Sequence, residues 1–238
     1  MIISKFYNLS ALLVISFLIL ASCSDDKTSP NDSKLIYDVK MNPSSIATPY
    51  EADSNNIELL FTDASFSLEE VYFHAGSNKT EIEIESNTKT RLNLLTGESS
   101  PVLPQLSLAK GTYENIKFGL KLDNEKDDYA LLLKGVFTDS EDISIPFELR
   151  ISDYLEIELQ SESNLEFEGK ELVEIKFNAE RIFDSIDSAL IFKGSKDQNN
   201  ILVISEDDNS SLYEMILKNL KDNGEDDSLF EVNIEFEN

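Results

Sequence analysis

Apolar side chains occupy every second position through most of the chain after residue 35, and this alternation constrains the fold more than any other feature. The positions between them are mostly Glu, Lys, Asn or Ser. A period of two with one polar face is typical of antiparallel β-strands. The clearest runs are Ile116, Phe118, Leu120 and Leu122; Ile143, Ile145, Phe147 and Leu149; Leu155, Ile157 and Leu159; and Val173, Ile175 and Phe177.

Turn signals separate these runs at residues 75–78, 95–98, 109–111 and 123–128. Because two amphipathic sheets bury their apolar faces against each other, many short strands predict a sandwich or a barrel. The run 129–137 is apolar on both faces at its centre, which indicates a central strand. We therefore predict a mostly β protein, an antiparallel β-sandwich of Ig-like or Greek-key type with one short C-terminal helix.

The helix is expected after Ser211, which forms a capping box with Glu214, and its end is expected at Asn223-Gly224. Leu212, Met215, Ile216 and Leu220 lie on one side of it. With strands at 201–204 and 229–236, it predicts a β-α-β extension over 196–238, packed on a sandwich domain at 35–195. The apolar stripe favours a core helix over a partner-binding helix.

The N-terminus carries one charge, Lys5, before the apolar run 11–20 and the small pair Ala21-Ser22. This run is about half of the ~20 residues that a spanning helix needs, so residues 1–22 read as a signal peptide. Residues 23–34 are polar and lack large apolar side chains until the domain begins, and they are expected to form a flexible tether.

The tetrad Leu20-Ala21-Ser22-Cys23 resembles the bacterial lipobox, which implies lipidation of Cys23 and anchoring of the chain in a membrane. Cys23 is the one cysteine, so no intramolecular disulfide is expected. Asp25 and Asp26 resemble the export signal of Bacteroidota-type surface lipoproteins. The resemblance implies a lipid-anchored protein of the outer membrane, on its periplasmic or extracellular face.

Composition excludes some classes of function. The chain has 46 acidic and 20 basic residues, a net charge of -26, which disfavours binding to nucleic acid. The one histidine, His74, is expected on the outward face of its strand, opposite Val71 and Phe73. With one histidine and one cysteine, the chain lacks the residues for a Ser-His-Asp or Cys-His catalytic site. Ordinary zinc or copper sites need clustered His or Cys and are therefore not expected. We therefore expect no enzyme and assign no catalytic residue.

Calcium is the better candidate for a cofactor, although none is required. Asp123, Glu125 and Asp127 alternate in an acidic loop, and such oxygen ligands suit a hard cation. The loop is no EF-hand, since Asp128 replaces its glycine and Lys134 its final glutamate. Solvated acidic turns are the favoured alternative. No spacing singles out a carboxylate pair of the glycosidase kind.

Four segments resemble domain-of-unknown-function family 4382, a family of bacterial lipoprotein domains. They cover about the first half of the predicted domain and comprise Leu60-Phe61-Thr62-Asp63-Ala64, the strand Leu68 to His74, Leu92 to Gly97, and Leu106 to Leu120 with its Gly111-Thr112-Tyr113 hairpin. The family has no established activity, so the resemblance implies fold and location only.

The expected function is that of a non-enzymatic binding or interaction module whose ligand the sequence does not identify. Loops on a rigid sandwich commonly carry recognition. The expected partners are the membrane, through Cys23, and a glycan or an envelope protein. A calcium-stabilised adhesive module, a carboxylate-dependent carbohydrate-active enzyme and a structural envelope lipoprotein remain as alternatives.

Overall fold

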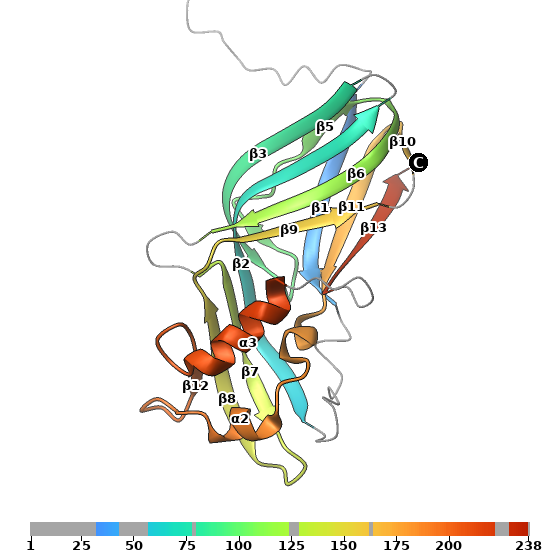
Figure 1. The fold of residues 1–238 in the computed structure, drawn as a ribbon. Helices are drawn as coiled ribbons and strands as arrows, with labels where there is room; N and C mark the ends of the chain where they lie inside the picture. Colours follow the sequence, from blue (N-terminus) through green and yellow to red (C-terminus); the bar gives the residue numbers. More distant parts are fainter. Residues whose placement is uncertain are drawn as a thin grey trace, which may run out of the picture. The chain divides into compact units, whose positions relative to one another are not determined.

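Two β-sheets make up most of the computed structural model, which describes residues 32–42, 57–77, 80–123, 129–161, 164–221 and 229–237 (Figure 1). The smaller sheet has the strand order β13-β11-β1-β5. The prediction of a mostly β, two-sheet architecture is therefore confirmed. The strands of the smaller sheet are β1 (Asp32–Met41), β5 (Leu106–Ala109), β11 (Lys170–Phe177) and β13 (Phe230–Glu237).

The larger sheet has the order β10-β6-β2-β7-β8-β12, with β3 on β2, β4 on β3 and β9 on β6. The run predicted as a central strand forms β7, which lies between β2 and β8. The strands are β2 (Glu58–Ser77), β3 (Thr80–Asn93), β4 (Ser99–Ser100), β6 (Gly111–Leu122), β7 (Leu131–Thr138), β8 (Ser144–Ile151), β9 (Leu155–Gln160), β10 (Leu165–Phe167) and β12 (Leu202–Ile204).

The sheets are mixed, whereas the sequence predicted an antiparallel arrangement throughout. β1 runs parallel to β11 and β12 runs parallel to β8, while the other pairs are antiparallel. Alternation of apolar side chains reports which face of a strand is buried, and it carries no information about the direction of the neighbouring strand.

The long strand β2 changes partner part of the way along its length. Its residues 58–66 pair with β7, and its residues 68–76 pair with β6. Ser67 lies at the change: its N–H donates to the Ala130 carbonyl (3.0 Å), and its carbonyl accepts from the Asp123 N–H (3.1 Å). The end of β6 and the start of β7 therefore meet at one residue of β2.

The part of the large sheet around β6 packs against the small sheet. Aromatic rings join the two layers, with centroids 6.4 Å apart for Tyr37 and Phe118 and 5.4 Å apart for Phe66 and Phe177. The buried Tyr37 hydroxyl donates to the backbone carbonyl of Tyr72 across the interface (2.7 Å). This half of the protein is a β-sandwich.

The part around β7 and β8 is covered by a helical segment instead (Figure 1). It comprises the 3-10 helix η1 (Ala179–Phe183), α2 (Ser188–Lys193) and α3 (Ser210–Lys221). The Phe183 ring lies edge-on to Phe137, with centroids 5.1 Å apart. The Asn219 amide of α3 donates to the carbonyls of Ile182 (3.0 Å) and Asp184 (2.9 Å). The predicted stripe of α3 is indeed packed, since Leu212, Ile216 and Leu220 are buried.

Segment boundaries differ from those predicted. β1 begins at Asp32, inside the expected tether 23–34, because backbone pairing with β5 needs no large apolar side chain. In the expected extension 196–238, β12 joins the large sheet and β13 the small one.

Helix α3 begins before the position predicted for it. It includes Ser211, since the Leu212 and Tyr213 N–H groups already donate to the Asn209 carbonyl. Its expected stop, Asn223-Gly224, lies outside the described residues.

Replacing Phe118 by alanine should lower the free energy of unfolding by about 3–5 kcal/mol. The Phe118 ring is fully buried and contacts the rings of Tyr37 and Phe73. Chemical denaturation of the wild type and the variant measures the difference. A change below about 1 kcal/mol would contradict the central place of this ring in the core.

Alkaline pH should destabilise the fold in part through Tyr213, a buried residue whose partly buried hydroxyl donates to Asp153 (3.1 Å). Burial, and then this hydrogen bond, raise the pKa of Tyr213 to about 12 from its ordinary value of 10.0. Below pH 10.0 the full contribution is present. Above it the unfolded chain loses a proton that the folded chain keeps, so stability falls as pH rises toward 12.

Tyr213→Phe should lose less stability than the wild type when unfolding is measured at pH 9 and again at about pH 11.5. The comparison isolates Tyr213 from other groups that titrate in this range. Equal losses in the two proteins would show that this hydroxyl has no part in the alkaline transition.

Candidate functional site

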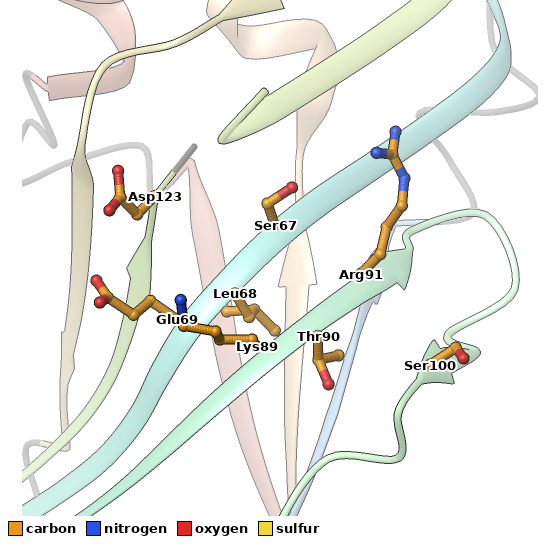
Figure 2. Close-up of a pocket in the computed structure, with 8 residues that line it drawn as sticks. All are labelled: Ser67, Leu68, Glu69, Lys89, Thr90, Arg91, Ser100 and Asp123. Carbon is orange, nitrogen blue, oxygen red and sulfur yellow. The ribbon is translucent and has the colours of Figure 1, made fainter. Parts of the chain in front are cut away.

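A pocket of about 240 Å³ opens on the large sheet where β2 changes partner (Figure 2). Its walls come from β2, from β3, from the short strand β4 and from the residue that follows β6. The lining side chains are those of Ser67, Leu68, Glu69, Lys89, Thr90, Arg91, Ser100 and Asp123.

A β-bulge in β2 forms this part of the sheet. Leu68 and Glu70 pair with the consecutive residues Leu122 and Lys121 of β6, so Glu69 is an extra residue on that side. The register between β2 and β3 also shifts between Leu68 and Glu70. A bulge bends its strand and redirects the side chains near it. The pocket therefore lies where the regular ladder is interrupted on both sides of β2.

The charge of the pocket differs from that of the chain as a whole. Lys89 and Arg91 stand with Glu69 and Asp123, two cations and two anions, whereas the chain carries 20 basic and 46 acidic residues. Figure 2 shows the two carboxylates at one end and Arg91 with Ser100 at the other. The pocket can thus offer hydrogen-bond donors and acceptors to one ligand from opposite ends.

Hydroxyl groups complete the lining. The Thr90 hydroxyl donates to the Pro101 carbonyl (2.7 Å), which ties β3 to the segment after β4. Ser67 Oγ is buried and has no hydrogen-bond partner within the part of the chain that the structure describes. A buried hydroxyl without a partner costs about 1–3 kcal/mol, which a water or a ligand group can offset.

A second, more open hollow of about 700 Å³ adjoins the pocket and shares Arg91 and Ser100 with it. The guanidinium of Arg91 donates to Ser65 Oγ (2.8 Å), so the residue is held between the two spaces. Gly97, with φ +75°, shapes the turn on the far side of the hollow. A ligand larger than the pocket could extend along this surface.

The sequence predictions for the site have different outcomes. Asp123, the first residue of the calcium hypothesis, lines the pocket. Glu125 and Asp127 lie outside the described residues, so the calcium site stays a prediction. Cys23 and the tetrad predicted to be a lipobox lie outside them as well, so lipidation also stays a prediction. Among the described residues, no helix is long and apolar enough to cross a membrane.

His74 lies away from this pocket, on the outward face of β2. Its side chain is 36% exposed, in agreement with the expected outward position, and Nε2 lies 2.9 Å from Glu83 Oε1. Sequence reasoning missed both this contact and the pocket. A signal for the pocket exists, since the apolar positions move from even (Phe66, Leu68) to odd (Val71, Phe73), a break in phase that a bulge produces.

Comparison of the chain with protein-family models, with curated proteins and with solved structures gave no match. The resemblance to family 4382 therefore stays a prediction, and a functional assignment depends on the geometry of the site.

Proposed function

We propose that this chain is a lipid-anchored, outer-membrane binding module that takes a small polar group, such as one sugar residue of a glycan, in the pocket at the bulge of β2. The observation that carries the proposal is the lining of this pocket, in which balanced charges and hydroxyls surround one space in a strongly acidic chain.

Size and chemistry support a sugar residue. The pocket is smaller than the ~300–1,000 Å³ of a drug-sized site, which suits a single polar unit. Serine and threonine hydroxyls, carboxylates and basic side chains together donate to and accept from hydroxyl groups. The adjoining hollow gives room for further units of a chain.

Two carboxylates in one pocket, Glu69 and Asp123, also favour a second candidate, a carbohydrate-active enzyme. In glycoside hydrolysis one carboxyl group protonates the leaving oxygen while the other acts as nucleophile or base. The binding role is preferred because the same pocket also holds two cations, Lys89 and Arg91, and this mixed lining serves hydrogen bonding to polar groups.

The anchor supports a place close to the membrane. Asp32, the first residue of β1, lies nine positions after Cys23. A fully extended chain spans at most ~3.6 Å per residue, so the tether reaches roughly 30 Å from a lipidated Cys23. We propose that the domain stays near the surface of the outer membrane and binds glycans there.

The pocket is tested by screening the purified full chain against an array of bacterial and host glycans, followed by titration calorimetry on those that bind. Glu69→Gln and Lys89→Met should each weaken binding about tenfold or more, because a hydrogen bond to a charged group is worth about 1.5–3 kcal/mol. Glu58→Gln, exposed on β2 away from the pocket, is the matched control and should bind like the wild type.

Release of reducing ends from a bound glycan, abolished in Glu69→Gln, would replace the binding role by the enzymatic one. Equal affinities for the wild type and both pocket variants would remove the pocket from the proposal.

The anchor is tested by Cys23→Ser, which removes the acylated thiol. Cells of a Gram-negative host expressing this variant should release the protein into the soluble fraction, while the wild type should sediment with the outer membrane. Metabolic labelling with a fatty-acid analogue should mark the wild type alone. Sedimentation of Cys23→Ser with the membrane would contradict lipid anchoring at this residue.

A further inference from the structure

The outward face of the β2–β3 hairpin gathers the lone histidine and two glutamates. His74 of β2 pairs directly with Glu83 of β3, and Glu85 lies two residues further along β3 on the same face. One ligand atom from each of these three side chains lies within 4.8 Å of the other two. The register of the hairpin thus brings together residues nine and eleven positions apart in the sequence.

The histidine ring is held in place before any ligand arrives. Its centroid lies 5.0 Å from that of Tyr72, and Nε2 lies 2.9 Å from Glu83 Oε1. Tyr72 is itself fixed: its ring covers Gly119, where a Cβ would overlap it, and its hydroxyl donates to Glu156 (3.2 Å). A preorganised ligand loses little conformational freedom when it binds.

The neighbouring lysines have closer partners than this cluster. Lys121 forms its nearest ion pair with Glu70, while its ammonium lies 3.7 Å from Glu85. Lys117, opposite His74 on β6, pairs with Glu158 at 2.7 Å. Of these lysine contacts, a cation that binds at the cluster therefore displaces only the longer one of Lys121.

We propose that His74, Glu83 and Glu85 bind a borderline divalent transition-metal ion, with Zn²⁺ as the type case. Imidazole nitrogen with carboxylate oxygen suits zinc, whereas calcium and magnesium prefer oxygen alone. Two carboxylates balance the charge of the ion. This site is independent of the glycan pocket and goes beyond the proposed function.

The geometry requires movement of side chains alone. Ligand atoms about 2.1 Å from a tetrahedral zinc ion lie about 3.4 Å apart, so the cluster contracts from its present 4.8 Å limit. The proton between Nε2 and Glu83 leaves Nε2, either for Nδ1 or for the solvent, and the nitrogen lone pair binds the metal. A water molecule takes the fourth coordination position, and it can exchange with another ligand.

The test uses the full chain without a polyhistidine tag and with Cys23→Ser, so that no thiol binds the metal. Because His74 is the one histidine, its imidazole C–H signals in the proton NMR spectrum report unambiguously on this site. Addition of Zn²⁺ should shift these signals and saturate at one equivalent, and calorimetry should give the same stoichiometry. Millimolar Ca²⁺ or Mg²⁺ should leave the signals in place.

Variants then distinguish zinc binding at this site from non-specific attraction of the cation to the acidic surface. His74→Gln should weaken zinc binding by about 100-fold, and Glu83→Gln or Glu85→Gln by about tenfold or more. Glu235→Gln, exposed on β13, removes the same charge elsewhere and should bind like the wild type. Unmoved imidazole signals at saturating Zn²⁺, unchanged affinity in His74→Gln, or displacement by calcium would each overturn the proposal.

Discussion

The continuity of β2 across both halves of the large sheet is the constraint on which the rest of the structure depends. β2 pairs with β7 along its first part and with β6 along its second, so the same strand belongs to the sandwich and to the helix-covered half. The change of neighbour falls at Ser67, and the bulge at Glu69 breaks the regular ladder two residues later. The pocket lies there because the side chains near the break no longer follow the regular pleat.

The fold class could be read from the sequence because alternation records burial directly. Ile116, Phe118, Leu120 and Leu122 are all buried, as their spacing predicts. Alternation does not record which strands become neighbours, so the parallel pairs β1–β11 and β8–β12 were missed. It also hid the division of β13 and β12 between two sheets, since strands that flank one helix in sequence were assumed to remain together in space.

The candidate sites were harder to predict because they combine distant segments. The pocket is lined by Asp123 together with Glu69, Arg91 and Ser100, which lie 54, 32 and 23 positions earlier in the sequence. Only the pairing of strands brings these residues into one pocket. The contact of His74 with Glu83 did not follow from the turn predicted at 75–78, because β2 continues to Ser77. Ser77 pairs with Thr80, and only this register places residue 74 opposite residue 83.

The position of β1 has a mechanical consequence for a domain tethered at its N-terminus. β1 follows the proposed tether at once and lies between β11 and β5, in the interior of the small sheet. A pull along β1 acts across its backbone hydrogen bonds, which lie roughly perpendicular to the strand toward the antiparallel β5 and slanted toward the parallel β11. These bonds bear the load together in shear instead of opening one after another. Hydrodynamic drag on a bound partner would thus be resisted by the strongest direction of the sheet.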